Sequence, residues 1–223
     1  MKLRVSLFFT FALFLCSGIS LPVHADESDG QSFRVVSWNI SGDSHVTDAD
    51  LFNAMMKHMK PDVLIMDEVL PLTSAAQLKA ALADIDPQDD RSWNVSFGAS
   101  GGRQRNVIAS RWPVEASFVF EGVIPYPEEE REIIAAQMTP EDHQFIRFSM
   151  EGGIPVNGAI VDIDGRRLLA VSVDLQCCGG TSDDWQEFRR MVEARVIRNL
   201  TSRALSSHKV DGAIIVGDLN TVG

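Results

Sequence analysis

Cysteine is scarce in this chain of 223 residues, which contains only three. Cys16 lies in an apolar N-terminal stretch, and the other two are the adjacent pair Cys177 and Cys178. A fold held together by disulfides is therefore excluded, because such a framework needs several cysteines spaced along the chain. A zinc site on the pair is excluded as well, since zinc needs more ligands, further apart. The pair itself can close a strained vicinal disulfide or remain as two thiols.

Positive charge is also in short supply. The chain has 20 Lys and Arg against 31 Asp and Glu, and its net charge is −11. An acidic chain repels polyanions, whereas nucleic-acid-binding proteins usually present a basic face. The composition therefore argues against tight, non-specific DNA binding, although a local basic patch or a bound metal can override net charge. Metal-ligand spacing is absent from the histidines at His45, His58, His143 and His208.

The N-terminus has the pattern of a secretory signal peptide. Lys2 and Arg4 precede an uncharged run over residues 5–21, and residues 23–25 have small side chains at the −3 and −1 positions. We therefore expect cleavage after Ala25, a secreted or periplasmic protein and no stable membrane insertion afterwards. Cleavage removes two positive charges, so the net charge changes from −11 to −13. The alternative is an uncleaved membrane anchor, because the apolar run is about the minimum length for a spanning helix.

The rest of the chain predicts one α/β domain over residues 33–223, after a polar, flexible stretch at 26–32. Short apolar runs alternate with segments of helical periodicity, and Asp164-Gly165 predicts a two-residue hairpin turn. Thr47 and Asp50 resemble a capping box, and the acidic stretch 122–144 is predicted to be an insertion or a long loop. Strands are predicted at 33–40, 62–66, 93–97, 106–110, 158–163, 166–173 and 213–216, and helices at 47–60, 74–85 and from 183 or 184 onward.

Acidic and amide side chains follow several of these strands directly. Strand ends are where layered α/β folds usually build ligand sites. Carboxylate and amide oxygens suit Mg²⁺, and an ion held there would neutralise a phosphate and activate an attacking water. The alternative is ordinary turn chemistry, because Asp and Asn are common at strand ends. The residues are Asn39, Asp67, Glu68, Asp174, Asp218 and Asn220.

Four short motifs resemble those of the endonuclease/exonuclease/phosphatase superfamily, and they occur in the same order. The resemblance covers roughly Phe33 to Gly223. It implies an α/β fold in which two β-sheets form a sandwich flanked by helices, the four-layer arrangement of DNase I-like proteins. The motifs are Ser37-Trp38-Asn39-Ile40, Asp62 to Val69, Asn106 to Val114, and Gly217-Asp218-Leu219-Asn220.

The resemblance also implies a function. The chain would hydrolyse phosphodiester or phosphomonoester bonds by in-line attack of water, with Mg²⁺ or Mn²⁺ as cofactor. Glu68 would be the principal metal ligand, and Asn39 would help to position the metal. Asp218 would orient the water and Asn220 would hold a phosphate oxygen. The substrate, whether a nucleic acid, a lipid or a sugar phosphate, stays open.

Two further residues are candidates for substrate binding. Asn106 belongs to the third motif, and Arg105 comes from the glycine-rich stretch that precedes it. A guanidinium can grip a phosphate through two hydrogen bonds. The alternative for Arg105 is a solvated arginine of a loop.

The chain departs from the superfamily pattern in two places. Asp174 stands where a His usually contacts the scissile phosphate, and an ionised Asp only accepts hydrogen bonds and repels phosphate. Asp174 would bind a cation or stay protonated beside other carboxylates, or the site is impaired. The final Asp-His pair of the superfamily is also missing, so we expect a fragment of a longer protein with residues 213–216 near an open sheet edge. A non-catalytic, metal- or partner-binding member of the same fold is the alternative function.

Overall fold

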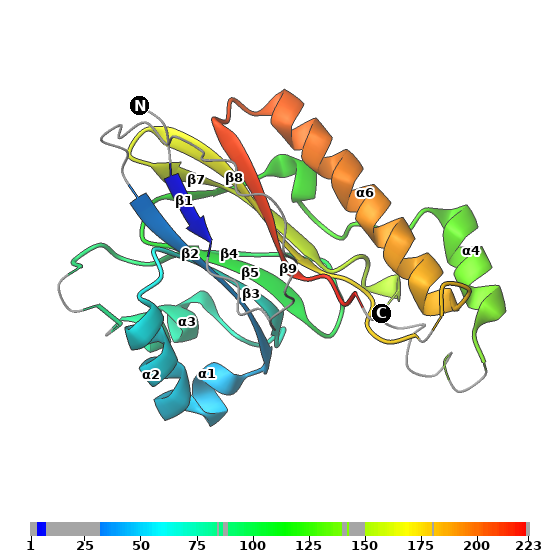
Figure 1. Ribbon diagram of the computed structural model, residues 1–223, viewed down its shortest axis with the longest axis horizontal. Helices are drawn as coiled ribbons and strands as arrows, with labels where there is room; N and C mark the ends of the chain where they lie inside the picture. Colours follow the sequence, from blue (N-terminus) through cyan, green and yellow to red (C-terminus); the bar gives the residue numbers. More distant parts are fainter. Residues whose placement is uncertain are drawn as a thin grey trace, which may run out of the picture.

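The computed structural model describes residues 4–7, 32–83, 85–86, 89–139, 142, 150–179 and 181–221. Two β-sheets pack face to face, with α1, α2 and α3 outside one sheet and α4 and α6 outside the other (Figure 1). The elements are β1 (Arg4–Leu7), β2 (Ser32–Gly42), α1 (Ser44–Thr47), α2 (Ala49–Met59), β3 (Val63–Val69), α3 (Ala75–Leu82), β4 (Asn94–Phe97), β5 (Arg105–Ser110), β6 (Val114–Ala116), η1 (Phe118–Phe120), α4 (Glu128–Gln137), β7 (Val156–Ile163), β8 (Arg166–Asp174), α6 (Trp185–Ser207) and β9 (Gly212–Asp218).

Both sheets are mixed. The first has the strand order β1-β2-β3-β5-β4, in which β2 and β3 are parallel and β3 and β5 antiparallel. The second has the order β6-β7-β8-β9, in which β7 and β8 form a hairpin and β8 and β9 are parallel. The predicted two-sheet sandwich flanked by helices is therefore confirmed.

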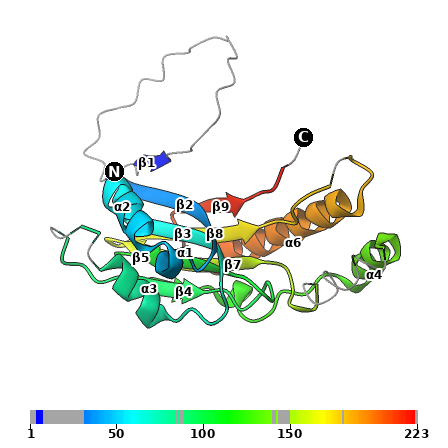
Figure 2. The same ribbon diagram turned by 90° about the horizontal axis from the view of Figure 1, so that it is seen from below.

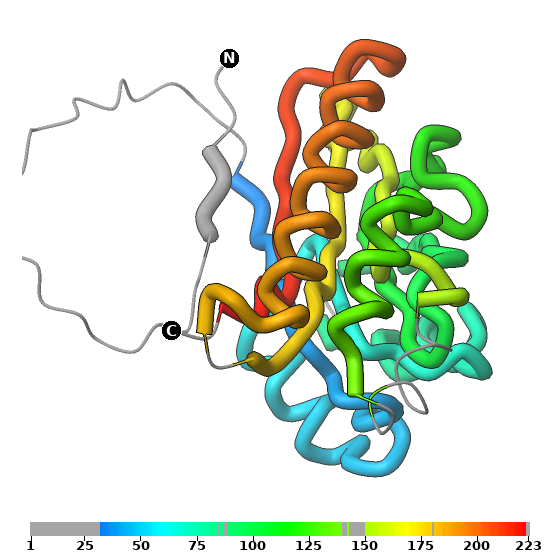
Figure 3. Tube along the Cα trace, turned by 90° about the vertical axis from the view of Figure 1, so that its right-hand side faces the viewer, coloured from blue at the N-terminus to red at the C-terminus, as the bar shows by residue number. Residues whose placement is uncertain are grey.

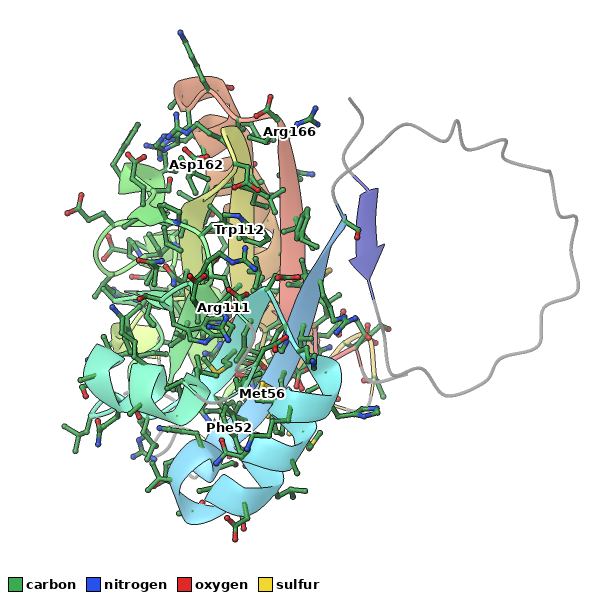
Figure 4. All side chains as sticks on the ribbon, turned by 90° about the vertical axis from the view of Figure 1, so that its left-hand side faces the viewer. Phe52, Met56, Arg111, Trp112, Asp162 and Arg166 are labelled. Atoms are coloured by element: carbon green, nitrogen blue, oxygen red, sulfur yellow. The ribbon has the colours of Figure 1, made fainter. Side chains whose placement is uncertain are left out.

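Alternation along β3 shows how the layers form. Side chains of a strand point to opposite faces in turn, so Val63 and Ile65 enter the core between the sheets, whereas Leu64 and Met66 face the helices. All four are fully buried, as expected for a strand covered on both sides. Phe52 and Met56 of α2 pack onto the helix-facing side (Figure 4).

The second sheet is covered on its outer face by the 23-residue helix α6. Leu169 and Val171 of β8 pack there with Val192 and Ile197. Seen from below, the two sheets lie between the two groups of helices (Figure 2). Burial on both faces of both sheets yields four layers.

Most predicted elements are confirmed, including the hairpin turn, where Asp164 and Gly165 both have positive φ, as a type I′ turn requires. Two predictions are wrong. Asp48, not Thr47, precedes α2, because the chain first forms the short helix α1. The stretch predicted as an irregular loop contains α4, which buries Ile134; residues 140–141 and 143–144 lie outside the described part.

Among the described residues the edge strands are β1 and β4 in the first sheet and β6 and β9 in the second. β9 is the outer strand of the second sheet among the described residues, as predicted, and α6 runs alongside it (Figure 3). Its Ile215 is 47% exposed, beside a cavity of about 210 Å³ that is also lined by Ile197. In the first sheet, the edge strand β1 pairs with β2. β1 belongs to the predicted signal peptide, of which residues 1–3 and 8–25 lie outside the described part. Residues 26–31 of the predicted flexible stretch also lie outside it.

Candidate metal and phosphate site

The apolar core between the sheets ends in polar side chains. On β3, Val63 and Ile65 face the other sheet, and the same alternation turns Asp67 toward it. On β9, Val216 lies in this core and Asp218 is two residues further along the same face. The candidate residues therefore come together because each one continues a core-facing row past the last apolar side chain.

Asp174 reaches the same place from β8. Leu168 and Ala170 face the core between the sheets, and the row continues through Ser172 to Asp174. Asp174 is the register partner of Asp218 in the parallel pair β8 and β9, as Asn39 is of Asp67 in β2 and β3. The two partner pairs belong to the two facing sheets.

Three carboxylates form one compact group, the carboxylate cluster of Asp67, Asp174 and Asp218. Each offers an oxygen, and these oxygens lie within 4.8 Å of one another. Asp67 is completely buried and Asp174 is 7% exposed. Neither oxygen of Asp67 accepts a hydrogen bond from another residue in the described part of the chain.

Asn39 links the cluster to Glu68. Its Nδ2 donates to Glu68 Oε1 at 2.9 Å and to Asp218 Oδ2 at 3.2 Å, while its Oδ1 accepts from the backbone N–H of Ser41. The amide therefore faces the acidic groups with its donor end. The predicted metal residues Asn39 and Glu68 do lie beside Asp218, and ligation by them stays a prediction.

The backbone is irregular where Glu68 leaves the sheet. The register between β3 and β5 shifts between Met66 and Val69, and Glu68 itself has φ +57°. A bulge of this kind re-aims a side chain, and positive φ is costly for Glu. The bulge explains how two successive residues, Asp67 and Glu68, both serve one site.

Asn220 contacts the other carboxylate oxygen of Asp218, because its backbone N–H donates to Oδ1 at 2.9 Å. Its Nδ2 donates to the Leu175 carbonyl oxygen at 2.7 Å and to Asp174 Oδ1 at 3.4 Å. Asn220 has φ +48°, a left-handed conformation that Asn tolerates better than most residues. Its amide is thus held next to the cluster.

The two predicted substrate-binding residues lie side by side at the start of β5. Asn106 is 1% exposed and donates from Nδ2 to Ser172 Oγ at 3.0 Å, so it joins the two sheets beneath the cluster. Arg105 is partly exposed and is the register partner of Val69, one residue beyond Glu68. Phosphate binding by either residue stays a prediction.

Burial and mutual repulsion act on the cluster in the same direction. Burial raises the pKa of Asp67 to about 7, and the charges of Asp218 and Glu68 add to this effect. Burial also raises the pKa of Asp174 to about 8, with further contributions from Asp67, Glu68 and Asp218. Without a counter-charge, Asp67 and Asp174 therefore take up protons at a higher pH than an ordinary aspartate does.

This donor set fits a hard divalent cation. Carboxylate and amide oxygens are the ligands that Mg²⁺ and Mn²⁺ take, and a cation would supply the partner that the buried Asp67 lacks. Two oxygens on one Mg²⁺ are at most roughly 4 Å apart, twice the metal–oxygen distance. The cluster oxygens lie within 4.8 Å of one another, so a small inward movement would bring all three onto one ion.

Hydrogen bonds to the buried Glu193 of α6 hold the loop after Asp174 in place. Glu193 is fully buried; its Oε2 accepts from the Gln176 backbone N–H at 2.6 Å and its Oε1 from Arg189 Nε at 2.9 Å. Arg190 donates to the carbonyl oxygens of Gln176 and Cys178. Cys177 and Cys178 are exposed, free thiols at the end of this loop.

Sequence reasoning noticed Asp67 at the end of its strand, but the resemblance gave the metal roles to Glu68 and Asn39. The signal was present: Val63, Ile65 and Asp67 alternate, so Asp67 had to face the other sheet. Glu193 was missed altogether, because a Glu inside a helix usually lies on its solvated face.

Residues 36–222 match the model of the Endonuclease/Exonuclease/phosphatase family. None of the curated proteins matches the chain. Two similar solved structures are truncated TDP2 from Caenorhabditis elegans, with 16% identity and a TM-score of 0.52, and SmcL, with 16% identity and a TM-score of 0.52. The matches cover 84% of this chain in both cases, and 62% of the TDP2 chain and 63% of the SmcL chain. At this identity the two structures support the fold alone, and this chain spans under two thirds of their length.

Proposed function

Because the chain belongs to the endonuclease/exonuclease/phosphatase family, we propose that it hydrolyses phosphodiester or phosphomonoester bonds with the help of Mg²⁺ or Mn²⁺. The observation that supports this most strongly is the convergence of the carboxylate cluster, Glu68, Asn39 and Asn220 at one end of the sandwich core. A phosphoesterase or nuclease-like hydrolase is what the family supports; the metal requirement and the kind of bond are the proposal.

The metal would be held by Glu68 and Asp218, with Asn39 positioning these two carboxylates. When bound, a divalent cation cancels charge on the phosphate and lowers the pKa of a coordinated water. Asn39 already joins the two carboxylates through its amide, so they are held together before any ion arrives. This prior arrangement reduces the ordering that binding requires.

The chain's own residues would do the positioning. The Asp218 carboxylate accepts a hydrogen bond from the attacking water and aims it in line with the bond to be broken. Asn220 donates an N–H to a non-bridging phosphate oxygen, and Arg105 gives that phosphate a positive neighbour at the rim. Asp218 belongs to the cluster and Asn220 contacts it.

Two roles for Asp174 are compatible with the site. With a proton on it, the carboxyl would donate to the leaving oxygen as a general acid. With a cation beside it, the ionised carboxylate would be a ligand. The acid role predicts that kcat falls once the pH rises above the pKa of this carboxyl, which burial raises above its ordinary value.

The test is hydrolysis of bis(p-nitrophenyl) phosphate and p-nitrophenyl phosphate by the purified chain with Mg²⁺, Mn²⁺ or EDTA. We expect activity that needs the metal and that Glu68→Gln lowers on the order of 100-fold or more in kcat/KM. Glu121→Gln changes an exposed Glu outside the site and is the matched control. Equal activity of Glu68→Gln and Glu121→Gln would contradict the proposal.

A binding function without hydrolysis is the second candidate. The observation that favours it is Asp174 itself, since a carboxylate next to two others repels a phosphate unless its charge is cancelled. Metal binding that is lost in Glu68→Gln, together with no hydrolysis of either ester, would support this candidate over the enzyme.

We also propose that the protein is secreted or periplasmic, on the strength of the basic, apolar and small-x-small pattern that ends at Ala25. None of the helices in the described residues is long and apolar enough to cross a membrane. N-terminal sequencing of the protein after expression with its leader should begin at Asp26. A sequence that begins at Met1 in the exported fraction would contradict cleavage.

A further inference from the structure

With all four of its carboxylates ionised, as metal ligation requires, the site carries more negative charge than one divalent cation cancels. Four ionised carboxylates, Asp67, Glu68, Asp174 and Asp218, sum to −4, so one divalent cation leaves −2 and two leave none. The charges that act on Asp174 come from these groups and from Glu193, all acidic. Residual charge in a buried site is costly, and it repels a phosphate ester.

Asp67 gives independent evidence of a missing positive partner. It is 0% exposed, and within the described part of the chain no other residue donates to either of its oxygens. Buried carboxylates are otherwise paired or bind metals. One oxygen of Asp67 lies within 4.8 Å of oxygens of Asp174 and Asp218, so the unpartnered group is aimed into the cluster.

The contacts divide the acidic groups into two sets that share one member. Glu68 and Asp218 accept from the same nitrogen of Asn39, whereas Asp67, Asp174 and Asp218 form the cluster, to which Glu68 does not belong. Asp218 is common to both sets. Its Oδ2 faces Asn39 and its Oδ1 accepts from the Asn220 N–H, so its two oxygens have different neighbours.

We propose that the site binds two divalent cations, one between Glu68 and Asp218 and the second within the carboxylate cluster, with Asp218 shared. The proposal rests on the phosphoesterase function for its purpose, since paired ions stabilise both the attacking and the leaving oxygen of an in-line displacement. It makes Asp67 and Asp174 ligands of the second ion. A phosphate ester can then approach an acidic site whose charge has been cancelled.

Binding of Mn²⁺ to the metal-free full chain tests this without any substrate. Titration calorimetry should give two Mn²⁺ per chain, and the electron paramagnetic resonance spectrum should show two coupled ions. Asp67→Asn should reduce the stoichiometry to one and abolish the coupling. Asp50→Asn removes a charge from the exposed start of α2 and should still bind two.

A wild-type chain that binds a single Mn²⁺, with the same stoichiometry in Asp67→Asn, would overturn the proposal. Asp174→Asn makes the same prediction through another ligand, should Asp67→Asn fail to fold by circular dichroism. The two proposals can fail separately. Two bound Mn²⁺ without hydrolysis contradict the phosphoesterase alone, and hydrolysis by a chain that binds one Mn²⁺ contradicts the second ion alone.

Discussion

Gly217 lies against Val173 so closely that a Cβ on Gly217 would be 1.8 Å from the Val173 carbonyl oxygen. The two residues are register partners on β9 and β8, and Gly217 has φ +141°. The next pair in the register is Asp174 and Asp218. The missing side chain thus lets β9 approach β8 just where the two carboxylates join the cluster.

Gly217→Ala should therefore be strongly destabilising. The new Cβ collides with backbone, which cannot swing aside, and φ is unfavourable for Ala, so we expect a loss of about 3 kcal/mol or more in the free energy of unfolding. Gly212→Ala is the control on the same strand, because its Cβ would meet only a Leu168 methyl at 3.8 Å. Urea unfolding of both variants measures the difference; equal stabilities would contradict the steric account.

The metal-free protein should lose stability as the pH rises. The pKa of Asp67 is raised from 3.8 to about 7 and that of Asp174 from 3.8 to about 8. Between these limits the folded state binds more protons than the unfolded chain, so the free energy of unfolding falls from about pH 4 toward pH 8. Urea unfolding at several pH values in EDTA should show this slope.

Two changes should flatten the slope. Asp67→Asn removes one of the titrating groups, and saturating Mg²⁺ or Mn²⁺ supplies the counter-charge that the ionised carboxylates lack. An identical pH dependence in wild type, Asp67→Asn and the metal-bound protein would show that the cluster is not the cause.

His45 should act in the opposite sense. It is 3% exposed, neither ring nitrogen has a hydrogen-bond partner in the described part of the chain, and burial lowers its pKa below 6.5. The unfolded chain then binds the extra proton, so stability falls as the pH drops below about 6.5. His45→Leu should remove this loss in urea unfolding between pH 7 and pH 5, whereas the exposed His58→Gln should not.

Glu193 should be far more important for stability than an exposed Glu. Glu193→Gln removes the carboxylate that pairs with the buried Arg189, and breaking a buried pair costs about 3–5 kcal/mol. Glu128→Gln breaks the exposed pair with Arg131 and should cost less than about 1 kcal/mol. Thermal unfolding of both variants compares them, and similar melting temperatures would contradict the prediction.

The hairpin at Asp164-Gly165 was predictable because its conformation depends on two residues and their allowed backbone angles. The helix α4 was not. It buries one apolar residue, Ile134, and the Arg195–Glu130 ion pair joins it to α6, so tertiary contacts and not periodicity identify it. The sequence therefore predicts elements that depend on neighbouring residues, and it misses elements that depend on tertiary contacts.

The candidate site shows the same division. Motif order pointed to Glu68, Asp218 and Asn220 individually, and the fold brings all three to one end of the core. Asp67 joins the cluster because the second sheet packs against its face of β3. No short motif contains that relation between distant segments. Asn106 likewise lies in the interior beneath the cluster, a depth that the sequence did not reveal.

The hydrogen bond between Asn39 and Asp218 joins residues 179 positions apart. Closing a loop of that length costs chain entropy, and contacts of such separation form late in folding. The parallel pairing of β9 with β8 also requires the whole of α6 to cross over first. We therefore expect the part of the site on β2 and β3 to form before the part on β9, so metal affinity during refolding should rise only in the final phase. A metal-sensitive probe would then report when the native topology is complete.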